Sequence, residues 1–169
     1  MPEPITAHCP ICEADVERPR DTLAGMAGAP QAIADAVREA AGTAEGWSAA
    51  EIAAHLADVE IGFGWRLRQT LAEDQPEIQP FDQDAWAAAT HYPERDADAS
   101  LLAFAAARAV NVEIMLRMSE AEWGRKFRHR EFGHLPIRTL VEHIADHDLA
   151  HLRQINGTHR NFSRFHGLR

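Results

Sequence analysis

The chain has 169 residues, of which 46% are hydrophobic and 25% are charged, values typical of one globular domain with a core of its own. Its formal net charge of -9 opposes the phosphate neutralisation that nucleic-acid binding requires, so we expect no nucleic-acid partner. No apolar run approaches the ~20 residues of a membrane-spanning helix. Residues 1–10 also lack the basic and then apolar pattern of a signal peptide. We therefore expect a cytoplasmic protein with no membrane partner, and its two cysteines exclude a disulfide scaffold.

The first half of the chain has two stretches of helical periodicity. Residues 21–41 are rich in alanine, although Pro30 and two nearby glycines weaken the early part of this predicted helix. The second stretch is clearer, because Ser48 and Glu51 form an S-x-x-E capping box at its start. From there the helical pattern continues to about residue 71.

The second half begins with a polar connection over residues 73–98, which contains three prolines and a predicted short helix at 84–90. Its length favours a crossover between distant helices over a tight turn. The third long helix is predicted at residues 99–118, followed by a short turn at 119–123. The fourth long helix is predicted at residues 136–155, with proline tolerated in its first turn.

We find no alternating β-branched segments separated by hairpin turns, and therefore predict no strand. The pattern predicts an all-α four-helix bundle over residues 20–169 with a long crossover connection. Residues 1–19 would form an N-terminal extension that carries the Cys9-Pro10-Ile11-Cys12 motif.

Four of the ten histidines lie on predicted helices. His143, His147 and His151 recur at i, i+4 and i+8 on the last helix. At about 100° per residue, His151 falls inside the apolar stripe, His147 at its edge and His143 further out, so we expect His143 to face outward. His55 lies on the flank of the apolar stripe of the second helix. For most of the other histidines we expect solvated side chains in loops or tails; these are His8, His91, His129, His134, His159 and His166.

Two inward histidines from one helix and one from another would present three neutral imidazoles, a set that suits zinc, nickel or iron. Three protein ligands would leave coordination positions open, as in a catalytic metal site. The alternative is that these histidines lie at the edge of the core and bond to carboxylates. Asp58 and Asp148 are candidates to orient the imidazoles. Asp148 could instead pair with a buried arginine such as Arg66.

Two short motifs remain open to other interpretations. The sequence His147-Asp148-Leu149-Ala150-His151 resembles the H-E-x-x-H of zinc peptidases, but the chain lacks the further histidine and any strand that could bind a peptide. Cys9 and Cys12, with His8 before them, have the spacing of half a zinc site. They could also be free thiols on an extension, or form a site with other ligands or with a second subunit.

Two longer segments carry a family resemblance. Residues 47–58, WSAAEIAAHLAD, resemble the second-helix signature of the DinB-like superfamily (the DinB/YfiT type), and residues 140–155, LVEHIADHDLAHLRQI, resemble its fourth-helix signature. The resemblance implies a four-helix bundle, a homodimer and a divalent metal held by three histidines. By motif, these are His55, His147 and His151. The chain departs from the family pattern in its Cys-x-x-Cys extension and in Pro136 at the start of the last helix.

The resemblance further implies a metal-dependent enzyme that activates a thiolate or water against a small electrophilic molecule. We therefore expect a thiol-dependent S-transferase or a hydrolase. The cofactor would be zinc or nickel, with iron or manganese as alternatives, and a low-molecular-weight thiol would be a cosubstrate of the transferase. The competing hypothesis is a metal-binding stress or sensor protein without turnover.

Overall fold

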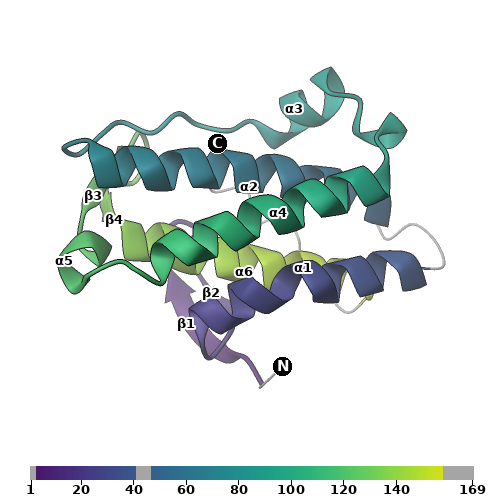
Figure 1. The fold of residues 1–169 in the computed structure, drawn as a ribbon, viewed down its shortest axis with the longest axis horizontal. Coiled ribbons are helices and arrows are strands. Elements are labelled where there is room, and N and C mark those ends of the chain that lie inside the picture. The colour runs from purple at the N-terminus through teal and green to yellow at the C-terminus, as the bar shows by residue number, and fades with distance from the viewer. Residues whose placement is uncertain (1–2, 41–46, 158–169) are drawn as a thin grey trace.

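Four long helices form a bundle in the computed structural model, which describes residues 3–40 and 47–157 (Figure 1). They are α1 (Thr22–Glu39), α2 (Ala49–Ala72), α4 (Ala97–Met115) and α6 (Ile137–Ile155). This confirms the predicted fold class, and the ends of these helices lie within a few residues of those expected. Within the described residues, none of the helices has the length and apolarity needed to cross a membrane.

The start of α2 is fixed by local hydrogen bonds. Glu51 donates its backbone N–H to the Ser48 hydroxyl, and Ser48 donates its own backbone N–H to the Glu51 carboxylate. The capping box is therefore formed as the sequence predicts. It satisfies two of the donors that a helix N-terminus leaves unpaired and sets the position of His55, one turn further on.

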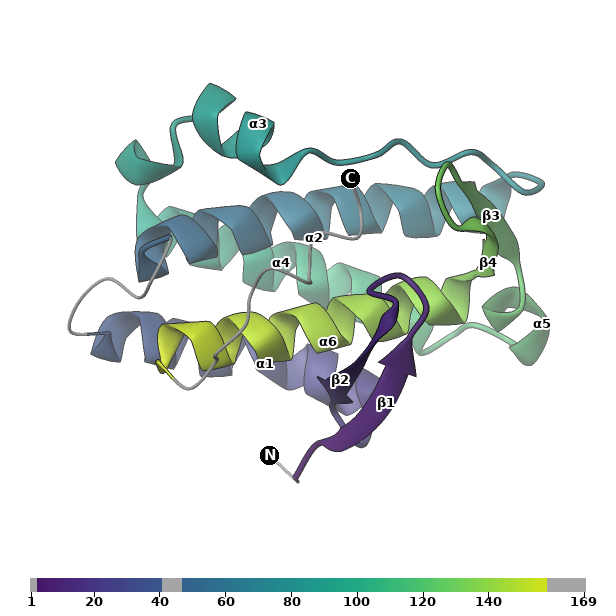
Figure 2. The ribbon, with the colours of Figure 1, turned by 180° about the vertical axis from the view of Figure 1, so that it is seen from behind.

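The long connection between α2 and α4 returns the chain along the length of the bundle, as Figure 1 shows. It contains the short helix α3 (Gln83–Ala89) and the 3-10 helix η1 (Tyr92–Glu94). As a result α4 runs in the same direction as its neighbour α2, whereas α6 runs antiparallel to both (Figures 1 and 2). The predicted crossover is thus confirmed, and it places the start of α2 beside the end of α6.

The expectation that the chain has no strands is wrong. Strands β1 (Ile5–Cys9) and β2 (Ala14–Arg18) form one antiparallel hairpin, and β3 (Lys126–His129) and β4 (Gly133–Pro136) form another, after the short helix α5 (Glu120–Trp123). Strands of four or five residues allow only two or three inward positions, too few for a period of two to stand out. In β2 one of these buried positions is an arginine, Arg18, which hides the pattern further.

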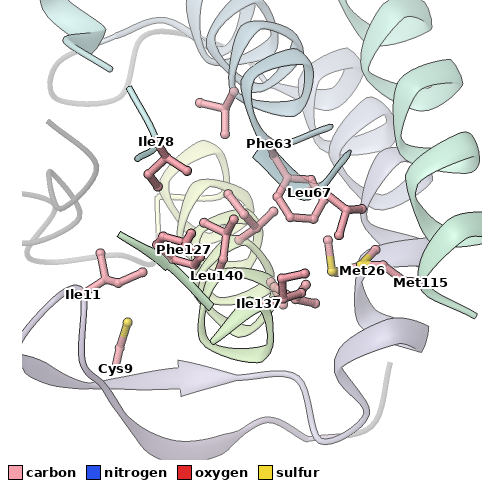
Figure 3. Close-up of a cluster of buried hydrophobic side chains, with 14 of the residues drawn as sticks. Cys9, Ile11, Met26, Phe63, Leu67, Ile78, Met115, Phe127, Ile137 and Leu140 are labelled. Atoms are coloured by element: carbon pink, nitrogen blue, oxygen red, sulfur yellow. The ribbon is translucent and has the colours of Figure 1, made fainter. Parts of the chain in front are cut away.

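The first hairpin packs against α6 (Figure 2). Arg18 donates two hydrogen bonds to the Asp146 carboxylate, at 2.9 and 2.8 Å, and one to Glu142 at 2.8 Å. Glu17 forms an ion pair with Arg153 at 2.8 Å. Cys9 and Ile11 of this hairpin belong to the main apolar cluster of the protein (Figure 3). Other members of the cluster are Phe63, Leu67, Phe127, Ile137 and Leu140.

Arg108 of α4 joins all four long helices in the bundle interior. It donates hydrogen bonds to Glu60 of α2 at 2.7 Å, to Asp148 of α6 at 2.5 Å and to the backbone carbonyl of Met26 in α1 at 3.0 Å. The Met26 carbonyl lies four residues before Pro30, which has no N–H to donate to it. The guanidinium therefore replaces the helical hydrogen bond that Pro30 cannot make.

Asp148 thus pairs with a buried arginine, as the alternative expects, but this arginine is Arg108 and not Arg66, which was named as the example. Arg66 instead donates to the backbone carbonyl of Gln79 at 2.5 Å. Burial raises the pKa of Asp148 to about 6, against the opposing effect of Arg108.

We predict that Arg108→Ala lowers the free energy of unfolding by about 3–5 kcal/mol, because two buried carboxylates lose their counter-charge. Urea denaturation followed by circular dichroism would measure the change. Arg117→Ala is the control: this arginine is exposed and its ion pair is with the exposed Glu113, so its loss should cost less than about 1 kcal/mol. If the Arg108 variant were as stable as the unmodified chain, the contacts of Arg108 with Glu60 and Asp148 would not hold the bundle together.

Candidate metal centre

The side chains of His55, His147 and His151 meet where the start of α2 lies beside the end of α6. The Nε2 atom of His147 is 3.1 Å from the Nε2 of His55 and 3.1 Å from the Nε2 of His151. The three side chains come from two helices and are buried, with exposures of 1%, 5% and 1%. The structure therefore brings together the three histidines that the sequence predicts as a set.

The spacing of these nitrogens fits one divalent cation. Nitrogens that bind a tetrahedral ion at 2.0–2.1 Å lie about 3.4 Å from one another, close to the separations seen here. A hydrogen-bonded network is less complete, because a single N–H on the Nε2 of His147 can point at only one of its two neighbours. Burial first, and then the neighbouring His151 and His55, lower the pKa of His147 well below its usual range. The ring is therefore neutral at pH 7, the form in which imidazole binds metals.

Gln154 helps to orient one of the three rings. Its Oε1 atom lies 3.0 Å from the Nδ1 atom of His151. An amide oxygen can only accept, so in the neutral form of the ring this contact favours a proton on Nδ1 and leaves the lone pair of Nε2, 3.1 Å from the Nε2 of His147, as a metal ligand. Gln154 was not among the predicted site residues. Its position three residues after His151 on the same helix is the signal that could have identified it.

The two predicted orienting carboxylates contact arginines. Asp58 accepts hydrogen bonds from the Tyr92 hydroxyl at 3.0 Å and from Arg95 at 2.9 Å. Asp148 is engaged by Arg108, so the peptidase-like interpretation would require a base that is already in a buried ion pair. The Nδ1 atom of His147 has no hydrogen-bond partner within residues 3–40 and 47–157. The observed contacts of Asp58 and Asp148 do not include an imidazole, so an orienting role for either carboxylate is a question for substitution experiments.

Aromatic side chains surround His55. The ring of Trp47, which directly precedes the capping residue of α2, lies 4.9 Å from the imidazole, and Phe81 of the crossover lies 6.2 Å from it. Trp47 also contacts Tyr92 of η1 edge to face at 5.7 Å. The crossover therefore covers one side of the three-histidine cluster with apolar surface, which lowers the local dielectric constant.

His143 does not face outward, contrary to the sequence prediction. It is 1% exposed, and its Nδ1 atom lies 3.5 Å from the sulfur of Cys9 and 3.5 Å from that of Cys12. Periodicity describes the face of α6 that the other long helices cover, but the β1–β2 hairpin covers a second face. The Cys-x-x-Cys motif was the signal that could have suggested such a contact.

The remaining histidines divide into two groups. His129 is buried, and its Nδ1 accepts backbone N–H groups from the turn between β3 and β4. Burial lowers its pKa. Its predicted solvated state is therefore wrong, whereas His8, His91 and His134 are exposed as expected. His159 and His166 lie outside the described residues.

These observations define a helical bundle with a buried three-histidine cluster at one end. A family model described as the DinB superfamily matches residues 14–155. The chain therefore belongs to the DinB superfamily, as the motifs of its second and last long helices predict.

Several curated relatives carry names that refer to metal dependence. The chain is 28% identical over 110 residues to a "putative metal-dependent hydrolase" of Oceanobacillus iheyensis, covering 65% of this chain and 63% of that protein. A protein of the same description from Geobacillus kaustophilus is 28% identical over 111 residues, which are 65% of this chain and 62% of the relative. The match thus spans less than two thirds of the length of either relative.

The fold is also similar to a solved structure, YfiT from Bacillus subtilis, described as "a probable metal-dependent hydrolase with an unusual four-helix bundle topology". The TM-score is 0.75 over 81% of this chain and 83% of YfiT, at 19% sequence identity. This similarity supports the bundle topology with its long crossover.

We predict that Asp58→Ala lowers the free energy of unfolding by about 2 kcal/mol, because the Tyr92 hydroxyl loses its buried acceptor and Arg95 its carboxylate. Metal content should be unchanged, since the observed partners of Asp58 belong to the crossover. Urea denaturation and elemental analysis would test both parts, with the exposed Glu113→Ala as control. Metal loss without a change in stability would show instead that Asp58 orients the cluster.

Proposed function

We propose that this chain is a metal-dependent enzyme that hydrolyses a small electrophilic substrate. The observation that carries the proposal is the meeting of three buried imidazole nitrogens from α2 and α6. His55, His147 and His151 would hold the metal, with zinc or nickel favoured by an all-imidazole set and iron or manganese as alternatives. The names of the relatives support hydrolysis over other reactions.

A divalent cation held by three neutral imidazoles supplies Lewis-acid activation at its remaining coordination positions. The chain itself supplies the geometry of the site. Gln154 fixes the tautomer of His151, and the low pKa of His147 keeps this ring available as a neutral ligand. Trp47 and Phe81 limit the access of water beside His55 and offer apolar surface to a small organic substrate.

A thiol-dependent transferase reaction is supported by the family resemblance alone. In that reaction a low-molecular-weight thiol takes the place of water as the nucleophile. A metal-binding stress or sensor protein without turnover is the other outcome to be tested.

The test uses protein purified without an affinity tag, analysed for metal and assayed with a panel of activated esters and other electrophiles. We expect about one metal ion per three-histidine cluster, turnover that is lost on chelation and turnover that does not require an added thiol. His55→Ala, His147→Ala and His151→Ala should each reduce activity and the retention of metal by this cluster at least about tenfold, because each removes one of three ligands. Circular dichroism should show folded bundles, since the apolar core does not depend on the metal.

His134→Ala is the matched control, because His134 is exposed and hydrogen-bonded to Gln75. It should leave metal content and turnover unchanged. Turnover that needs both metal and thiol would favour the transferase, and retained metal without any turnover would favour the sensor. Wild-type metal content in the His147 variant would show that the ligand assignment is wrong.

We also propose that two chains pair through helices of the bundle, as the resemblance implies. Large apolar side chains are exposed on α2 and α4, among them Ile61, Trp65 and Leu102 at 59%, 69% and 72%. Covering them in a dimer would remove apolar surface from water.

Light scattering should therefore give twice the mass of one chain, both for the unmodified protein and when Cys9 and Cys12 are replaced by serine. The double substitution Trp65→Glu and Leu102→Glu should give the mass of one chain, because it places a charge at two of these exposed apolar positions. Pairing through helices would be refuted if the unmodified chain were a monomer. It would also be refuted if replacing both cysteines by serine gave a monomer while the double glutamate variant remained a dimer.

A further inference from the structure

A second group of metal-ligating side chains lies one helical turn before the three-histidine cluster. Cys9 and Cys12 stand at the tip of the β1–β2 hairpin, and both sulfurs face His143 of α6. One ligand atom from each residue lies within 4.8 Å of the others. Cys9 and His143 are almost fully buried, whereas Cys12 is partly exposed. The proposed hydrolase makes no use of this group.

The distances fit a zinc ion. With Zn–S bonds of 2.3 Å and Zn–N bonds of 2.0–2.1 Å at tetrahedral angles, a sulfur and a nitrogen on one ion lie about 3.6 Å apart. Both sulfurs lie 3.5 Å from the same atom, Nδ1 of His143. The Cys-x-x-Cys spacing is also that of the paired ligands in structural zinc sites.

The hairpin tip is held in a conformation that directs both sulfurs to α6. The side chain of Ile11, between the two cysteines, is buried in the main apolar cluster (Figure 3). Glu13, directly after Cys12, has a φ of 49°, in the left-handed region that residues other than glycine rarely adopt. Such a conformation persists where surrounding contacts impose it. Here these contacts are the buried Ile11 and the pairing of Cys9 with Ala14 across the strands.

Cysteine binds metal ions as thiolate, so zinc binding at this group would release thiol protons and would strengthen as the pH rises.

We propose that Cys9, Cys12 and His143 form a second metal site that binds zinc and fixes the N-terminal hairpin to α6. Zinc would displace the thiol protons, which pass to solvent, and would bind two thiolates and the Nδ1 of His143. A solvent molecule or small ligand would take the fourth position. The ligands Cys12 and His143 are 131 positions apart in the chain, so the ion would close a long loop. The ion would stabilise the contact between the hairpin and α6, in addition to the ion pairs that Arg18 forms with Asp146 and Glu142.

The first test measures metal stoichiometry and the spectrum of cobalt as a zinc substitute. Protein purified without a tag under reducing conditions should hold two metal ions per chain. Cys9→Ser, Cys12→Ser and His143→Ala should each lose one. His8→Ala is the matched control and should lose none, because His8 is exposed and paired with Asp15.

Cobalt distinguishes this site from the three-histidine cluster, because only sulfur ligands give thiolate-to-cobalt charge-transfer absorption in the near ultraviolet. This absorption should persist in His147→Ala and disappear in Cys9→Ser. The cobalt spectrum therefore tests the cysteine site even if the protein shows no hydrolase activity. Likewise, hydrolase activity could be found even if the cysteine site binds no metal.

A second measurement needs no substitution and so does not depend on the folding of a variant. Zinc added to the metal-free, reduced protein should slow alkylation of the two thiols, and a chelator should restore it. The proposal is overturned if cobalt gives no charge-transfer absorption and alkylation is indifferent to zinc. It is also overturned if protein purified under reducing conditions contains a Cys9–Cys12 disulfide.

Discussion

The arrangement of the bundle depends on the buried guanidinium of Arg108. It contacts Glu60, Asp148 and the Met26 carbonyl, and so links α4 to α2, α6 and α1 at once. A buried charge of this kind tolerates little displacement, because each of its partners would otherwise be left desolvated and unpaired. Arg108 also makes a proline at position 30 of α1 acceptable. Pro30 has no N–H to donate to the Met26 carbonyl, and Arg108 donates a hydrogen bond to this carbonyl instead. The register of α6 against α2, on which the histidine cluster depends, is held by the same contacts.

Helix α6 is the element that both metal-ligating groups share. Its histidines at positions 143, 147 and 151 lie one turn apart, yet they face different partners. His147 and His151 meet His55 from α2, whereas His143 meets the two cysteines of the hairpin. The carboxylates between them have equally distinct partners, since Asp146 binds Arg18 of the hairpin and Asp148 binds Arg108 of α4. One helix with covered surfaces on two sides thus carries five polar side chains, each held by a neighbour of suitable chemistry.

The predictions that succeeded rest on interactions within one helix. The capping box of Ser48 and Glu51 marked the start of α2, and the period of the apolar residues marked the long helices to within a few residues. The three-histidine set could be predicted because its members lie near the apolar stripes that face one another in any such bundle. The hairpins were missed since their strands are short and their inward residues include Arg18 and His129. His143 was misplaced for a related reason, because its position was judged against the bundle alone.

The sequence by itself determined the class of fold and the crossover, because these follow from the periodicity of the long helices and from the length of the connection between two of them. It also indicated which histidines converge, through motifs within single helices that resemble those of the family. Only the tertiary structure decided which charges pair. Asp148 and Arg108 are 40 positions apart, Arg18 and Asp146 are 128 apart, and nothing in their local sequences distinguishes them from other candidates. It also decided that Cys9, Cys12 and His143 form a group. That contact requires a hairpin to fold back onto a helix at the other end of the chain, and such pairings are set by the packing of the whole molecule.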